Sequence, residues 1–190
     1  MNKNEKKMKV NTKYEAAPSA APVVIEQVWA EKPGGGIISN PANVVKQGSA
    51  VAADGNRFKA IKAYVLVKAV QASDETIQIA KGSGVANGDV IGHGKKAVAC
   101  TAVDTSNEAY DSVTVTLGVD IAKGVALYEA KAASANAAAP KDVPVYIAGN
   151  DVPAGEGDYA VRLINGCNLR KETAPVAEEV VALMKGVNLV

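Results

Sequence analysis

The sequence predicts a mainly β fold: a compact β-sandwich or barrel with an extended N-terminal arm and one C-terminal α-helix. Ala, Val and Gly are abundant, whereas Phe, Trp and His occur once each. Small and β-branched residues suit the thin layers of packed sheets. Short β-like segments also alternate with turn residues along most of the chain, and helical periodicity is clear only near the C-terminus.

The chain divides into three expected regions. Residues 1–22 form a flexible basic arm, because the first 13 residues hold five lysines and one glutamate and the rest are rich in Ala and Pro. Residues 23–170 form the β body, which includes an Ala-rich segment, 130–140, expected as a short helix or a surface loop. Residues 171–190 form the C-terminal helix and tail.

The β body is expected to contain eight strands separated by Gly-, Pro- and Asp-rich turns. Residues 76–80 alternate as a half-buried strand does, and the same period continues in 112–117. Residues 61–70 form the longest apolar run. The expected strands are 23–29, 61–70, 76–80, 97–103, 112–117, 125–129, 143–148 and 159–164.

A helix is predicted over 174–186. Pro175 suits the first helical turn, two glutamates follow near the positive end of the helix dipole, and Gly186 suits the stop. Four apolar residues share one face at helical spacing, and this face should pack on the β body or on a neighbouring subunit. They are Val176, Val180, Leu183 and Val187.

The residues offer little for catalysis, and we expect no catalytic residue, metal site or cofactor. The glycines of 82–89 and 88–96 miss the dinucleotide and phosphate-loop spacings, which favours turns. His93 has no second His for a metal site and is expected in an exposed loop. Cys100 and Cys167 lie in apolar runs and are expected as buried free thiols in preference to a disulfide. The loop that begins at Asp104 carries oxygen ligands but is expected to be a solvated acidic loop.

The basic arm contrasts with a mildly acidic remainder, which suggests docking on an acidic surface. A purely solubilising tail is the alternative. Trp29 suits either an interface or the core. The candidate attachment residues are Lys3, Lys6, Lys7, Lys9, Lys13 and Tyr14.

Four segments carry a resemblance to a known family: KAIKAYVLVKAVQASDETIQIAKGSG, NGDVIG, SVTVTLGVDIAKGVALYEA and NLRKETAPVAEEVVALMKGVNLV. In their pattern and order they resemble head-fiber proteins of tailed bacteriophages, especially crAss-like and related phages of gut Bacteroidales. The resemblance implies a homo-oligomer, usually a trimer, fixed to the outside of the capsid, with no cofactor and no reaction. Long fibrous extensions of the family are missing here, which favours a short decoration protein.

We therefore expect a non-enzymatic virion structural protein, made in the host cytoplasm and placed on the capsid exterior. Its expected partners are further copies of itself (a trimer, or else a dimer), the major or another capsid protein, and a host surface glycan. No nucleic-acid or membrane partner is expected. The alternatives are a capsid-cement or tail component, a small carbohydrate-binding module, and a hydrolase that uses His93. The candidate oligomer interface consists of Trp29, Val176, Val180, Leu183 and Val187.

Overall fold

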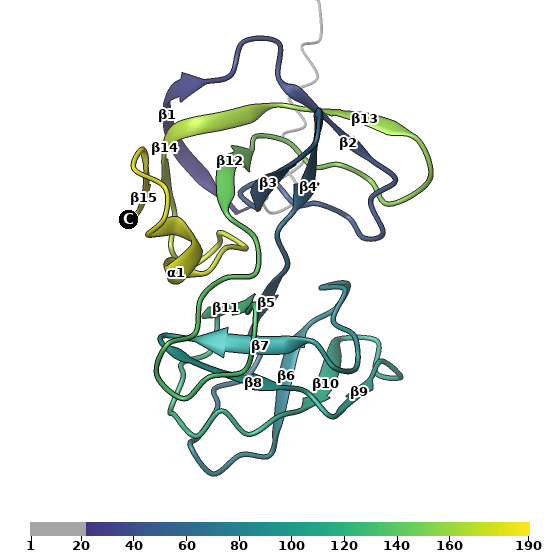
Figure 1. Ribbon diagram of the computed structural model, residues 1–190, viewed down its shortest axis with the longest axis vertical. Coiled ribbons are helices and arrows are strands. Elements are labelled where there is room, and N and C mark those ends of the chain that lie inside the picture. The colour runs from purple at the N-terminus through teal and green to yellow at the C-terminus, as the bar shows by residue number, and fades with distance from the viewer. Residues whose placement is uncertain (1–21) are drawn as a thin grey trace, which may run out of the picture.

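The structure is a computed structural model that describes residues 22–190, and it divides into two β lobes. The terminal lobe contains 22–62 and 141–190, and the inserted lobe contains 63–140 (Figure 1). The chain crosses between the lobes twice, after β4 and before β12. The prediction of a mainly β fold with a C-terminal helix is confirmed. The β body expected over 23–170 therefore has two parts in space, and the arm residues 1–21 lie outside the described residues.

The terminal lobe is built on one eight-stranded sheet with the order β1-β14-β12-β3-β4-β2-β13, to which β15 adds by pairing with β14. Only Arg162 separates β13 from β14, although the two strands stand far apart in this order. The sheet therefore curls round toward itself as a partial barrel. Its strands are β1 (Ile25–Glu31), β2 (Gly36–Ser39), β3 (Ala50–Asp54), β4 (Arg57–Ala60), β12 (Pro144–Ala148), β13 (Asp158–Val161), β14 (Leu163–Leu169) and β15 (Val187–Leu189).

The inserted lobe contains two smaller antiparallel sheets, with the orders β6-β10-β9 and β5-β11-β7-β8. A core of its own fills the space between them, built around Leu66, Ile77, Ile79, Val113 and Leu127. Its strands are β5 (Ala63–Val65), β6 (Thr76–Ala80), β7 (Val90–His93), β8 (Lys96–Ala99), β9 (Ala102–Asp104), β10 (Tyr110–Thr114) and β11 (Ala126–Glu129).

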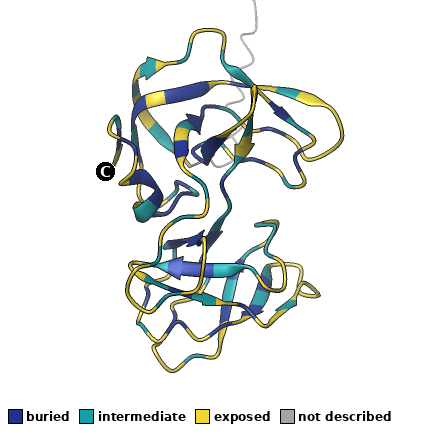
Figure 2. Cartoon of the chain, in the orientation of Figure 1, coloured by how far each residue is buried: buried dark blue, intermediate teal, exposed yellow. Residues whose placement is uncertain are grey.

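The two lobes share a third region of core. All four residues of β11 are buried, and Tyr128 belongs to the same apolar cluster as Val176 and Val180 of the terminal lobe (Figure 2). Within the inserted lobe, the Tyr128 hydroxyl donates to the Gly94 carbonyl over 2.9 Å. Buried apolar contact between lobes favours one fixed arrangement over free relative motion.

Several strands differ from the prediction in extent. β6 coincides with 76–80, and β1, β11 and β12 match to within two residues. The expected strand 61–70 is reduced to β5, because its flanks form the crossing and isolated bridges. The expected strand 97–103 is split into β8 and β9, and 159–164 is split at Arg162 into β13 and β14. The segment 130–140 is a loop.

The C-terminal helix is shorter than predicted: α1 covers only Glu178–Val181. Ala177 before it is extended and offers no side-chain cap, so the helix does not start at Pro175. After it the chain turns into β15, which pairs in parallel with β14. Gly186 permits this turn, because a β-carbon there would lie 2.2 Å from the Asn165 carbonyl oxygen. Pairing with the sheet therefore outcompetes helix propensity in this segment.

The two ends of the described chain lie together. Ile25 of β1 and Leu189 of β15 both pair with Leu169 of β14, one on each side. Two backbone hydrogen bonds extend this arrangement, from Arg170 N to Val24 O and from Lys171 N to Val190 O, each 2.9 Å long. Both ends therefore belong to the terminal lobe.

Candidate functional site

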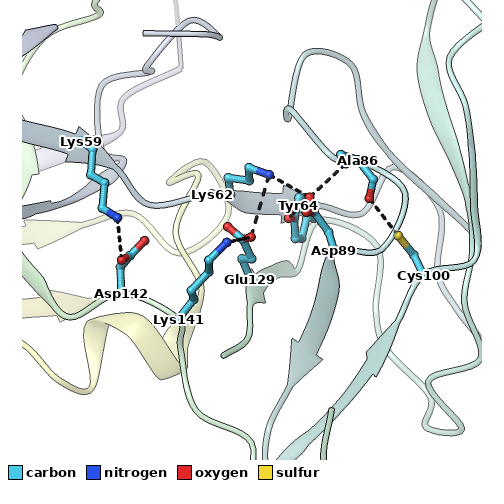
Figure 3. Close-up of polar contacts among 9 residues, drawn as sticks. All are labelled: Lys59, Lys62, Tyr64, Ala86, Asp89, Cys100, Glu129, Lys141 and Asp142. Atoms are coloured by element: carbon cyan, nitrogen blue, oxygen red, sulfur yellow. Dashed lines mark hydrogen bonds and ion pairs between the residues drawn. The ribbon is translucent and has the colours of Figure 1, made fainter. Parts of the chain in front are cut away.

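An ionic cluster fastens the two crossings to the inserted lobe (Figure 3). Lys62, on the first crossing, lies 2.8 Å from Asp89 and 3.9 Å from Glu129. Lys141, on the second crossing, lies 2.5 Å from the same glutamate. We call these four residues, together with Tyr64, the crossing cluster. Each crossing thus carries a lysine that pairs with a carboxylate of the inserted lobe.

Asp89 is the most highly coordinated carboxylate of the crossing cluster. It accepts hydrogen bonds from Lys62 Nζ (2.8 Å), the Tyr64 hydroxyl (3.0 Å) and the Ala86 backbone N–H (2.9 Å). Burial by itself raises the pKa of this carboxyl, but the three donors and the Lys62 charge outweigh it, so the pKa is lowered. Asp89 is therefore held as a charged acceptor.

Tyr64 and Glu129 complete the cluster from inside the inserted lobe. Tyr64 is fully buried, and burial next to two carboxylates raises the pKa of its hydroxyl. Glu129 is only 6% exposed, and its hydrogen bond with Lys141 raises the pKa of that ammonium. Paired buried charges fix geometry and contribute little net stability over apolar residues, whereas loss of one partner is costly. The cluster therefore suits the positioning of the lobes.

A second polar arrangement lies on the outer face of β1 and β14. The Trp29 side chain crosses Gly166, where an added β-carbon would lie 2.5 Å from Trp29 Nε1. Two ion pairs of 2.6 Å, Glu26–Arg170 and Glu31–Arg162, join β1 to the residues that follow and precede β14. Trp29 is nevertheless 51% exposed. We call this surface the Trp29 face; an exposed aromatic ring within a polar frame is typical of residues that anchor interfaces.

The predicted interface residues separate into two groups. Val176, Val180 and Val187 are 5%, 2% and 5% exposed and lie in the chain's own core, so they are not available to a neighbouring subunit. The helical face expected to meet either the β body or another subunit thus packs on the β body. Leu183 is 52% exposed and Trp29 lies on the surface described above, so an interface role for these two stays a prediction.

The candidate attachment residues, Lys3, Lys6, Lys7, Lys9, Lys13 and Tyr14, lie outside the described residues. The segment that bears them leads into β1, so it joins the protein beside the Trp29 face. Their role in attachment stays a prediction.

His93 differs from the prediction of an exposed loop residue. It ends β7, is partly buried, and its Nδ1 lies 3.6 Å from Glu179 of α1. The Gly94 backbone N–H donates to the same carboxylate. His93 therefore takes part in a contact between the lobes, because α1 packs against the β7–β8 turn.

Cys100 and Cys167 are free and buried, as predicted. Cys100 Sγ donates to the Ala86 carbonyl over 3.1 Å, and burial raises the pKa of the Cys167 thiol to about 11. Within residues 22–190 no three His, Cys, Asp or Glu side chains gather as a metal site requires. No helix of this range is long and apolar enough to span a membrane.

Comparison of the chain with protein-family models, with curated proteins and with solved structures finds no match in any of the three. The likeness to phage head-fiber proteins therefore stays a resemblance.

The residues that form these two arrangements were not singled out from the sequence, apart from Trp29. Asp89 lies in an Asn-Gly-Asp turn, and such a turn indicates a chain reversal but names no partner. The sequence gives one indication of the cluster: Lys62 and Glu129 each lie in an apolar, strand-like run. Burial of a charged side chain in such a run costs free energy unless a partner neutralises it.

Proposed function

We propose that this chain is a non-enzymatic virion structural protein, a head-fiber or capsid-decoration protein that oligomerises and attaches to the outside of a phage capsid. The proposal extends the family resemblance with the arrangement of the two lobes. It places the attachment end on the terminal lobe and lets the inserted lobe project, where it can contact a host surface.

One observation carries the proposal: the Trp29 face, the joining point of the basic N-terminal segment and both ends of the described chain belong to the terminal lobe, and none of them to the inserted lobe. A decoration protein needs one end that grips the shell and one end that projects. Basic residues steer the first end toward an acidic shell, and the exposed Trp29 side chain supplies an anchor between subunits that brings several such ends together.

Oligomerisation is the second part of the proposal. Trp29 and Leu183 are about half exposed and both belong to the terminal lobe. If subunits contact one another through this lobe, their N-terminal attachment segments lie close together. Several attachment ends on one particle convert weak contacts into tight binding. A trimer is the state proposed.

The test combines sedimentation with capsid binding. Analytical ultracentrifugation gives the subunit number, and co-sedimentation measures binding to capsids assembled from the major capsid protein encoded in the same genome. We expect a trimer that pellets with capsids and is released by salt. Deletion of residues 1–13 and Trp29→Ala should each reduce binding, whereas Val143→Ala, at an exposed apolar site near the second crossing, should leave it unchanged. A monomer that never pellets with capsids would refute the proposal.

A further inference from the structure

A groove of about 630 Å³ runs between the two lobes, on residues that the proposed function does not use. Its walls come from residues 38–46 and 59–62 of the terminal lobe and 80–83 of the inserted lobe. The lobes touch beside it, since a β-carbon at Gly84 would lie 2.2 Å from Asn43 Nδ2. Ligand sites typically have volumes of about 300–1,000 Å³ and lie where two domains meet.

The charge on the groove wall has one sign. Four lysines line it, and no aspartate or glutamate does. These lysines are Lys46, Lys59, Lys62 and Lys81. Their wall positions predict attraction for a ligand that carries negative charges at several points along its length.

Carboxylates outside the groove lining hold these lysines in place. Asp142, Asp89 and Asp111 each lie 2.8 Å from one ammonium group, those of Lys59, Lys62 and Lys81 respectively (Figure 3 shows the first two pairs). Lys81 also donates to the Thr105 carbonyl, and Lys62 also lies 3.9 Å from Glu129. An ammonium group has three N–H donors, so each of these lysines keeps at least one donor for a ligand. Lys46 is held more loosely, 4.0 Å from Asp151. Because the carboxylates fix their positions, these lysines present their remaining N–H donors at set points. The carboxylates also offset the lysine charges, so an anionic ligand is attracted only at short distance.

The remaining lining is aliphatic and amide- or hydroxyl-bearing. Val44, which is 45% exposed, and the partly buried Val65 supply the apolar surface, whereas Val45 and Ile61 are only 3% and 5% exposed and lie beneath it. No aromatic side chain lines the groove. Stacking on aromatic rings is the usual way to hold bases, and it is common for sugar rings, so this lining favours neither nucleic acid nor saccharide. Aliphatic side chains beside lysine donors match a peptide that alternates acidic and aliphatic residues.

We propose that the interlobe groove binds an extended acidic peptide segment of a partner protein, with its carboxylates on the groove lysines and its aliphatic side chains on the valines. The inference is independent of the capsid role. The basic N-terminal segment of this chain has the wrong charge for the site.

The test uses a fluorescein-labelled peptide of alternating glutamate and leucine, with fluorescence anisotropy on the full chain. Binding should weaken with added salt, and the glutamine–leucine peptide should bind about 10-fold more weakly. Lys46→Gln/Lys59→Gln should also weaken binding of the acidic peptide about 10-fold. The matched control, Lys68→Gln/Lys123→Gln, removes the same charge from exposed lysines outside the groove and should change binding less than about 2-fold.

Circular dichroism establishes that both double variants are folded. Absence of peptide binding at low salt, equal binding of the acidic and glutamine peptides, or equal losses in the two double variants would each overturn the proposal. Polygalacturonate is the saccharide probe. If it binds more tightly than the peptide and displaces it, the groove is assigned to an acidic saccharide and the peptide proposal is wrong.

Discussion

Asparagine at position 89 would keep the shape of the side chain but remove its charge. Asp89 is 14% exposed at its side chain and accepts three hydrogen bonds, two of them from the Lys62 ammonium and the buried Tyr64 hydroxyl. An amide cannot accept all three, and its NH₂ group faces donors. The Ala86 N–H is exposed and gains water, and Lys62 keeps Glu129 at 3.9 Å.

The expected cost of Asp89→Asn is therefore close to one charged hydrogen bond, about 2 kcal/mol of unfolding free energy. For a chain of this length that lowers Tm by about 4–8 °C. Urea unfolding followed by far-UV circular dichroism measures the loss. The matched control is Asp158→Asn, an exposed carboxylate that accepts from Arg57 and Ser39, and it should cost less.

The pH dependence follows from the lowered pKa of Asp89. A carboxyl whose pKa is lower in the folded than in the unfolded protein stabilises the fold fully only when the pH lies above its pKa in the unfolded protein, which is about 4. That contribution is lost as pH falls through the folded pKa. The difference in stability between wild type and Asp89→Asn should thus be equal at pH 7 and pH 5 and should shrink below about pH 4. A cost no larger than that of Asp158→Asn, or a difference that persists in acid, would refute the role given to this carboxylate.

Three further predictions concern close packing and the thiols. Gly166→Ala should cost about 1–3 kcal/mol in urea unfolding and shift Trp29 emission, because the new methyl group meets the indole at 2.5 Å; unchanged emission would contradict this. Gly186→Ala should destabilise the protein more, since its β-carbon would lie 2.2 Å from a backbone oxygen of β14. Amide hydrogen exchange should then show that β15 has lost its protection. Protection of β15 equal to that in the wild type would count against the pairing. Cys100 and Cys167 should resist a disulfide reagent at pH 8 in the folded protein and react fully in denaturant, because both are buried and the pKa of the Cys167 thiol is raised to about 11; rapid native labelling would be inconsistent with this burial.

Local alternation was enough to predict strands whose two faces differ. β6 could be placed from the sequence because Ile77 and Ile79 are buried while their neighbours are less so. The run 61–70 could not be divided in the same way. Its apolar residues serve three environments, namely the terminal lobe at Ile61, β5, and isolated bridges at Leu66 and Val70. Periodicity records burial, and it does not tell which sheet provides the burial.

The β3–β4 hairpin was missed although its turn is written in the sequence. Gly55 follows Asp54 and is the first residue of a two-residue hairpin loop. This position requires a positive φ, and the φ of Gly55 is +58°. β3 lacks alternation, because it begins with three buried residues, and β4 alternates over only four residues and is at most half-buried. Turn chemistry was the better guide at this point.

The candidate sites depend on long-range proximity, which explains why the sequence did not predict them. The crossing cluster joins Lys62, Asp89, Glu129 and Lys141, and no local spacing links these positions. The division into lobes was hidden for the same reason, since the terminal lobe is built from both ends of the chain. Among the residues of these sites, Trp29 alone had been singled out, and its exposure fits one of the two alternatives that the sequence had left open.

The common pairing of β1 and β15 with Leu169 has a mechanical consequence. Tension applied between the two ends of the described chain would act across β14 within a few residues and would have to peel β1 or β15 away from it, starting at Leu169. The force would not pass through residues 63–140. The inserted lobe would keep its shape under such tension until the β1–β14 or β14–β15 ladder gave way.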